Sequence, residues 1–254
     1  MSTETARPAS PSPRHGYTAA QVRAAEAPLL AAGEPLMQRA AAALADEVER
    51  LLAPRAGAAD GASGPLVVVL AGSGDNGGDA LFAGAHLAER GADVRIVAVG
   101  PRLHEEGAAA AHRAGATDLD PDADPAAFAA AIDAADILVD GILGIGAAAS
   151  PALRGRARDV VARVLERLAE RGHAEKPAGM RHPLVVAVDL PSGISPDDGR
   201  VPDPTVLPAD VTVTMGAVKA GLLLPPASRL AGRVVLVDLG LGPALAGAEP
   251  AVTV

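Results

Sequence analysis

Residues 65–84 read PLVVVLAGSGDNGGDALFAG, and this stretch decides the fold class. Its first residues form a short apolar run rich in valine, which predicts a buried strand, and its last residues begin a helical pattern. A glycine-rich turn between a strand and a helix usually cradles phosphate on backbone N–H groups. This turn also carries Asp75 and Asp79, so it predicts a ligand that is held by glycines, an amide and carboxylates together.

The alternation of apolar strands and helices continues along the chain. Continuous apolar strands separated by helices imply a mostly parallel sheet that is covered on both faces. We therefore predict an α/β protein, a Rossmann-like three-layer sandwich with an N-terminal helical extension. The expected strands are 65–72, 93–100, 136–143, 182–193, 210–216 and 233–242, and the expected helices are 79–91, about 104–114, one within 121–135, and 153–172.

The N-terminal region precedes this alternation. Residues 1–16 are rich in Pro and Ser, which predicts a disordered tail, and 17–246 form one domain that a C-terminal tail, 247–254, follows. Thr18 and Gln21 fit a capping box that starts a helix to about residue 30, and a second amphipathic helix spans 35–52. These two helices either form a dimer interface or pack on their own sheet.

Composition excludes several classes of protein. The 254 residues have a net charge of −9, 1% aromatic residues and no Trp, which disfavours a nucleic-acid partner. With no Cys there is no disulfide framework and no thiolate nucleophile. The chain shows neither a signal-peptide pattern nor an apolar run that could span a bilayer, so we expect a cytoplasmic protein without membrane partners.

The turn GSGDNG also matches the dinucleotide pattern G-x-G-x-x-G, and that match alone is weak. An ordinary Rossmann site needs an acidic residue about 20 positions on, where this chain reads AVGPR. A plain structural interpretation makes Asp79 the cap of the following helix. That interpretation leaves Asn76 and the glycine pair Gly77 and Gly78 unexplained.

Three further motifs place polar residues at strand ends, where ligands bind in such sheets. VDGILGIG ends a strand at Asp140, and VDLPSG presents Asp189 and Ser192 after another. Asp140 alone could simply be a solvated strand end. In MGAVKAGLLLPP, Lys219 lies between apolar segments, where it is either a proton-transfer group with a lowered pKa or a snorkelling surface lysine.

If the side-chain oxygens of Asn76, Asp140 and Ser192 converge, they form a small site made of oxygen atoms alone. Such ligands suit alkali or alkaline-earth cations rather than zinc. A cation there would offset the local negative charge of the glycine-rich turn.

Four motifs follow one another along the chain: GSGDNGGDA, VDGILGIG, VDLPSG and ADVTVTMGAVKAGLLL. In this order they resemble the NAD(P)H-hydrate epimerase family, and the resemblance spans about residues 17–242. It implies an enzyme that interconverts the R and S epimers of hydrated NADH and NADPH, commonly as a homodimer, with one bound potassium ion. A dehydratase, here expected on another chain, completes the repair. Epimerisation at C6 proceeds by ring opening or by loss and return of water, and each route needs proton transfer.

The resemblance also implies roles for individual residues. Asp189 is the candidate acid or base and a substrate contact, and Lys219 is a second proton-transfer or charge-stabilising group. Potassium is expected on Asn76, Asp140 and Ser192. The expected substrate contacts are Asp75, Asn76, Gly77, Gly78 and Asp79 in the first loop and Gly144, Ile145, Gly146, Ala147, Ala148, Ala149 and Ser150 in the second.

The chain departs from the family pattern at two places. Asp75 stands where the family usually has Asn, and the loop GIGAAAS is unusually rich in alanine. Two other functions compete with the epimerase. A scaffold of the same fold would have lost its acid–base groups, and a hydride-transferring oxidoreductase would need a ribose-binding acidic residue that the second strand lacks.

Overall fold

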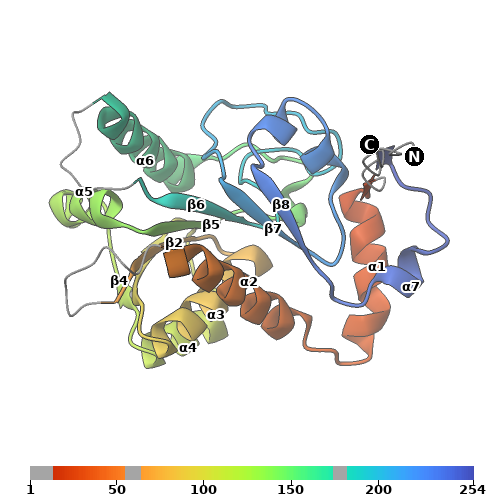
Figure 1. Ribbon diagram of the computed structural model, residues 1–254, viewed down its shortest axis with the longest axis horizontal. Helices are drawn as coiled ribbons and strands as arrows, with labels where there is room; N and C mark the ends of the chain where they lie inside the picture. Colours follow the sequence, from red (N-terminus) through yellow and green to blue (C-terminus); the bar gives the residue numbers. More distant parts are fainter. Residues whose placement is uncertain (1–13, 55–63, 174–181) are drawn as a thin grey trace, which may run out of the picture.

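The computed structural model describes residues 14–54, 64–173 and 182–254, and its main element is a seven-stranded parallel sheet (Figure 1). From β2 the chain first adds β3 and β4 on one side and then β5 to β8 on the other. The order therefore reverses between β2 and β5, which is where ligands bind in doubly wound sheets. In spatial order the strands are β4 (Thr117–Asp118), β3 (Asp93–Ala98), β2 (Leu66–Ala71), β5 (Ile137–Gly141), β6 (Leu184–Val188), β7 (Val211–Met215) and β8 (Arg233–Val237).

Helices cover both faces of this sheet (Figure 1). The alternating side chains of β2 show why, because Val67 and Val69 belong to one apolar core and Val68 and Leu70 to the other. Both cores consist mainly of aliphatic side chains, with Phe128 as a buried aromatic residue of the second. One face carries α2 (Leu36–Leu52), α3 (Asp75–Glu89) and α4 (Glu105–Arg113), and the other carries α5 (Pro125–Ala134) and α6 (Gly155–His173).

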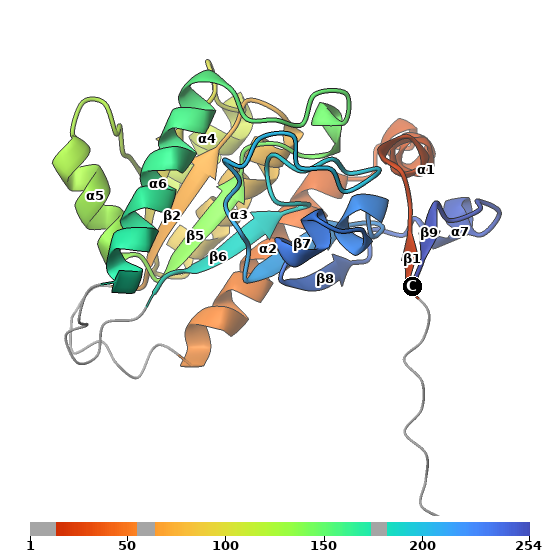
Figure 2. The ribbon, with the colours of Figure 1, turned by 90° about the horizontal axis from the view of Figure 1, so that it is seen from above.

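The two N-terminal helices have different positions. Helix α2 packs on the sheet with α3, as one of the two interpretations of this region predicted. Helix α1 (Ala19–Ala31) lies outside the sandwich, beyond the strand ends (Figure 2), and the predicted capping box is present, with Thr18 N donating to Gln21 Oε1 at 2.9 Å. The apolar side of α1, Val22 and Ala25, packs against Leu241 and Leu245 near the C-terminal helix α7 (Gly242–Leu245).

The two ends of the described chain pair with each other. β1 (His15–Gly16) and β9 (Val252–Thr253) form an antiparallel ladder, and Arg14 and Val254 exchange two backbone hydrogen bonds of 2.8 and 3.0 Å. Residues 1–13 of the predicted tail lie outside the described residues, and its last three residues, 14–16, belong to the described chain. Within the described residues, no helix is long and apolar enough to cross a membrane.

Candidate active site

A cavity of about 710 Å³ opens at the carboxyl ends of the strands, beside the point where the strand order reverses. This volume is in the range of sites that bind cofactor-sized ligands. Several segments line it: one face of α1, the start of α3, the loops after β3 and β5, the start of α6, and the ends of β6 and β7. The predicted site residues that line this cavity are Asp75, Asn76, Asp79, Gly144, Ile145, Gly146, Ala147, Ser150, Asp189 and Lys219.

The glycine-rich motif after β2 is the first turn of α3, not a loop before it. The helix begins at Asp75 with Gly74 as its N-cap, so the prediction that Asp79 caps the helix was wrong. The reason is a close backbone contact. A Cβ atom on Gly77 would lie 2.1 Å from the carbonyl oxygen of Gly72, so only glycine lets the helix start this close to the strand end.

Asp189 and Lys219 form a buried ion pair through Asp189 Oδ1. Lys219 is 1% exposed and also donates to the carbonyl oxygen of Met215 at 2.7 Å, while Met215 N donates to Asp189 Oδ1 at 3.2 Å. Asp189 has a φ of +68°, a left-handed conformation that an aspartate tolerates better than most residues. The snorkelling interpretation of Lys219 is therefore wrong, and the lysine faces the cavity from within the fold.

Asp140 and Ser192 are hydrogen-bonded beneath the cavity. Ser192 Oγ donates to Asp140 Oδ1 at 2.6 Å, and Ser192 N donates to Oδ2 at 2.8 Å. Asp140 is fully buried, and burial raises the pKa of its carboxyl while these hydrogen bonds oppose the rise. The alternative of a solvated strand end is therefore wrong.

Asn76 approaches the same cluster from α3. Leu143 N donates to Ser192 Oγ at 2.8 Å, and the neighbouring Gly144 lies against the Asn76 amide, since a Cβ on Gly144 would be 3.1 Å from Asn76 Oδ1. Asn76 is 7% exposed, and its Nδ2 is buried with no hydrogen-bond partner among the described residues. Ser192 and Asn76 thus both lie beside residues 143–144, and Asp140 is linked to this point through Ser192.

The second predicted loop divides two cavities. Its first part forms the short 3-10 helix η2 (Ile145–Ala147), which faces the main cavity. Ala148 and Ala149 do not line that cavity but a second one of about 640 Å³, which the loop separates from it. Gly77 and Gly78 are buried inside α3 and line neither of the two, so the structure gives them a packing position.

Three charged residues of the cavity were not identified from the sequence. Arg23 and Glu26 reach it from α1, and Arg154 reaches it from the segment before α6. Arg23 Nη1 donates to the carbonyl oxygen of Ile145 at 3.2 Å, and Arg154 Nη2 donates to Ser150 Oγ at 2.6 Å. The two arginines therefore hold the two ends of the 145–150 loop. The spacing of Arg23 and Glu26 on one side of a helix was the available signal.

Carboxyl groups crowd the cavity and perturb one another. Burial raises the pKa of Asp79 well above its usual range, and the charges of Asp189, Asp75 and Glu26 raise it further, with Lys219 opposing. Burial is also the main cause that raises the pKa of Glu26. Since each ionised carboxylate disfavours the next, protons are retained on some of them more readily than on isolated side chains.

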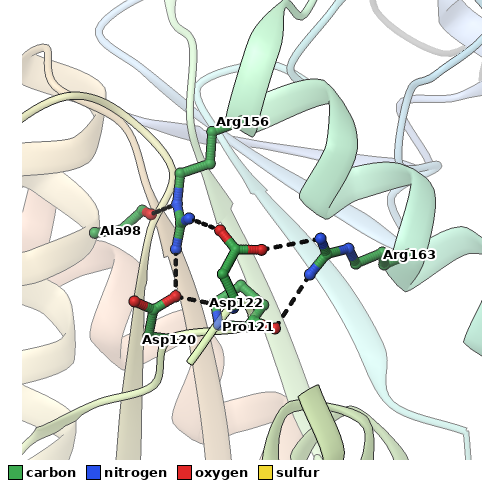
Figure 3. A network of polar contacts seen from close by, with 6 residues as sticks. All are labelled: Ala98, Asp120, Pro121, Asp122, Arg156 and Arg163. Atoms are coloured by element: carbon green, nitrogen blue, oxygen red, sulfur yellow. Dashed lines mark hydrogen bonds and ion pairs between the residues drawn. The ribbon is translucent and has the colours of Figure 1, made fainter. Parts of the chain in front are cut away.

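A polar network ties α6 to the end of β3 and to the loop after β4 (Figure 3). Arg156 of α6 donates to the carbonyl oxygen of Ala98 at 3.0 Å and to Asp120 Oδ1 at 2.6 Å, and it pairs with Asp122. Arg163, two helical turns further, donates to Asp122 Oδ1 at 2.9 Å. The network joins α6 to the end of β3, next to the cavity residues 99–101.

Comparison with known proteins adds independent evidence. The sequence profile of the family described as YjeF-related protein N-terminus matches residues 33–221. The chain is 53% identical to an NAD(P)H-hydrate epimerase of Clavibacter sepedonicus, over 92% of this chain and 93% of that one. It is 52% identical to an NAD(P)H-hydrate epimerase of Microbacterium testaceum, over 93% of this chain and 83% of that one.

Two more distant proteins resemble it as well. A bifunctional NAD(P)H-hydrate repair enzyme Nnr of Mycobacterium tuberculosis is 40% identical over 90% of this chain, which covers 42% of that protein. The crystal structure of the yeast protein ynu0, YNL200c, superposes with a TM-score of 0.68 at 19% identity and covers 92% of this chain and 94% of that one. The last similarity concerns the fold alone.

Proposed function

The chain belongs to the family of YjeF-related protein N-termini, and from this premise we propose that it is an NAD(P)H-hydrate epimerase that interconverts the R and S epimers of hydrated NADH and NADPH. One observation of the structure carries the proposal. The buried Asp189–Lys219 pair and the Asp75–Asp79 turn of α3 line a single cavity of suitable size. A scaffold protein has no need for a buried ion pair in such a cavity, because each buried charge is costly.

The reaction inverts the configuration at C6 of the hydrated ring, and each of two routes moves two protons. In the water-loss route, the C6–O bond breaks as the oxygen takes a proton, and the lone pair of the ring nitrogen forms a C=N bond. Water then adds to the other face and gives up a proton. In the ring-opening route, the hydroxyl loses its proton as the C6–N bond breaks, the nitrogen takes a proton, and the aldehyde is attacked again on its other face.

Both routes therefore require a proton donor and a proton acceptor, which act on the oxygen at C6 or on the adjacent ring nitrogen. Asp189 is the proposed acceptor, because its carboxylate lies at the cavity and is held by Lys219 and Met215 N. Lys219 pairs with this carboxylate and orients it. The positive φ of Asp189 turns the side chain away from the sheet end, where an ordinary extended residue would continue the strand.

The remaining predicted contacts are proposed to bind the dinucleotide. Residues 144–147 and the two arginines Arg23 and Arg154 line the cavity, and guanidinium groups suit the pyrophosphate of the substrate. Asp75 and Asp79 suit hydroxyl and amide groups of the substrate, because carboxylates accept hydrogen bonds from them. Asp75 in place of the usual Asn removes an amide donor at this point.

We place the family's potassium ion on Asn76, Asp140 and Ser192. The donor set fits, since it consists of oxygen atoms, and Ser192 and Asn76 both lie next to the backbone at 143–144. When bound, the ion supplies positive charge next to Asp140 and the loop that holds the substrate. Raising potassium from zero should raise the melting temperature, and equal sodium should do so less; Ser192→Ala should abolish the difference.

The proposal extends to partners and location. The matched region of the Mycobacterium tuberculosis relative occupies 42% of a bifunctional repair enzyme, so we expect a dehydratase on another chain to act on the epimers that this protein equilibrates. A cytoplasmic homodimer is the expected form. Helix α1, whose outer side includes the exposed Leu30, remains the candidate dimer contact, because α2 is buried on its own sheet.

Epimerisation of purified R-NADHX, followed by chromatography, tests the function. The protein should produce the S epimer far faster than the spontaneous rate, and Asp189→Asn should lower kcat by about 10²- to 10⁴-fold. Asp159→Asn, an identical change at an exposed position of α6, is the matched control and should leave kcat unchanged. Dinucleotide binding without acceleration would instead establish the scaffold.

A further inference from the structure

Glu26 is a carboxyl group of the cavity that the mechanism above does not use. It lies on α1 and lines the same cavity as Asp189 and Lys219. Four contacts fix its helix there: the Thr18–Gln21 capping box, a 2.6 Å hydrogen bond from Ala19 N to Asp197, the packing of Val22 and Ala25, and the pairing of the chain ends. The position of Glu26 is therefore built into the fold.

The backbone also ties α1 directly to the lysine. Tyr17 N donates to the carbonyl oxygen of Val218, and Ala220 N donates to that of Tyr17, both at 2.8 Å, so the residue before the helix cap is bridged to Lys219. Glu26 follows two turns later on the side of α1 that faces the cavity. Helix α1 lies beyond the strand ends from which Asp189 projects (Figure 2).

The carboxyl group of Glu26 is half-buried, and it has no hydrogen bond or ion pair with any residue that the structure describes. Structural carboxylates of this fold are engaged differently, as Glu47 shows by pairing with Arg50 and Arg233. A half-buried carboxyl group without a protein partner, in a cavity, is available to a ligand.

Its surroundings favour the protonated form. Burial raises the pKa of Glu26, and the negative charges of Asp189 and Asp75 raise it further, whereas Lys219 and Arg23 lower it. Asp79, the remaining carboxyl of this wall, is itself affected by the charge of Glu26. A carboxyl group that holds its proton to a higher pH than usual can donate a proton at a pH where an ordinary glutamate is ionised.

We propose that Glu26 is the second proton-transfer group of the epimerase, the partner of Asp189 across C6 of the hydrated ring. The proposal rests on the function proposed above. In one direction, by the water-loss route, Glu26 gives its proton to the leaving oxygen as the C6–O bond breaks and the ring nitrogen supplies the electrons of the C=N bond. Water adds to the other face, and Asp189 takes its proton.

In the reverse direction the two groups exchange roles, as microscopic reversibility requires. Each turnover leaves the pair in the opposite protonation state, and exchange with solvent through the open cavity restores it. Starting from one epimer, Glu26 must be protonated, so kcat falls on the alkaline side. Starting from the other epimer it must be ionised, so kcat falls on the acid side. The pH profiles of kcat from the two epimers therefore fall in opposite directions, one limb each, and both limbs report the ionisation of Glu26.

Glu26→Gln tests this, with kcat measured from each pure epimer across pH. We expect a loss of about 10²-fold or more in kcat from both epimers, KM within about threefold, and both Glu26 limbs removed. Glu26→Asp should recover part of the rate and the limbs. Glu34→Gln is the matched control, because the same change at an exposed position after the same helix leaves the cavity intact.

Three results would overturn the proposal. Glu26→Gln could keep kcat within about twofold of the wild-type value. It could be slow yet retain both pH limbs, which would make Glu26 a positioning residue only. If Glu26→Gln does not fold, a Glu26→Ala variant that keeps wild-type kcat and both limbs would overturn the proposal equally. A wild-type protein without epimerase activity would be a different failure, since it removes the proposed function first.

Discussion

Replacing Lys219 by methionine removes a buried charge while nearly preserving side-chain volume. Lys219 is 1% exposed and pairs with Asp189, whose side chain is 9% exposed. Without the ammonium, Asp189 is left as a buried carboxylate that keeps hydrogen bonds from Met215 N and Thr214. Breaking a buried ion pair from one side costs about 3–5 kcal/mol of unfolding free energy, because the remaining charge is uncompensated.

The double variant Lys219→Met/Asp189→Asn provides the comparison. Asparagine tolerates the positive φ at position 189 and carries no charge, so the double variant should be more stable than Lys219→Met alone. For a chain of this size each kcal/mol shifts the melting temperature by about 2–4 °C, so Lys219→Met should melt about 6–20 °C below the wild type.

Thermal unfolding followed by far-ultraviolet circular dichroism measures these differences, because the chain has no Trp and one Tyr for fluorescence. Asp159→Asn again serves as the control for an exposed charge. A Lys219→Met protein that melts within about 2 °C of the wild type would refute the reasoning, because less than about 1 kcal/mol would then depend on the pair. So would a double variant that is less stable than Lys219→Met.

Three further predictions concern the start of α3, Glu26 on α1 and the network around Arg156. Gly77→Ala should displace the helix start and lower both the melting temperature and substrate affinity, because its Cβ would meet the carbonyl oxygen of Gly72 at 2.1 Å. Gly74→Ala, whose Cβ would have no atom within 4 Å, should do neither, and equal effects of the two variants would contradict the packing argument. The free energy of unfolding of the wild type should fall as pH rises from the ordinary Glu pKa of 4.5 toward the raised pKa of Glu26, because the folded state then holds a proton that the unfolded state has lost. Glu26→Gln should flatten this fall in urea titrations across pH, and an unchanged dependence of stability on pH would contradict the burial of the group. Arg156→Ala should cost about 1 kcal/mol or less in stability, as expected for a partly exposed ion pair, but should raise KM by freeing the end of β3, so an unaltered KM would show that the network does not hold the cavity wall.

The layered parallel sheet could be predicted because apolar runs of the right length alternate with helices along the whole chain. The start of α3 could not. Two adjacent glycines have a low helix propensity, and the sequence therefore favoured a loop up to Asp79. Packing of Gly77 on the Gly72 carbonyl overrides that propensity, and this contact depends on the tertiary structure.

The role of Lys219 was open from the sequence for a related reason. Its partner lies 30 residues earlier, and the two meet because β6 and β7 are neighbours in the sheet. Strand ends could be located from the sequence, but the order of the strands could not. Once that order is known, the carboxyl ends of β5, β6 and β7 bring Asp140, Asp189 and Lys219 to one edge.

Arg23 and Glu26 escaped prediction because the sequence does not show where α1 docks. Its cavity side consists of two charged residues among alanines, which is typical of a solvated helix face. The docking depends on strands of two residues that pair across almost the whole chain, His15 with Thr253. Such short strands carry no recognisable pattern, and their pairing is a matter of topology.

The pairing of the chain ends also has a consequence for biosynthesis. The wall that carries Glu26 precedes the sheet in the sequence but is fastened by Val252 and Thr253, which follow the sheet. Contacts this distant in sequence form slowly because a long loop must close. The sheet can therefore assemble before residues 252 and 253 are made, whereas the cavity wall is fastened only after them. Ribosome-stalled chains ending before residue 252 should show a formed sheet without epimerase activity, and full activity in such chains would contradict this order of events.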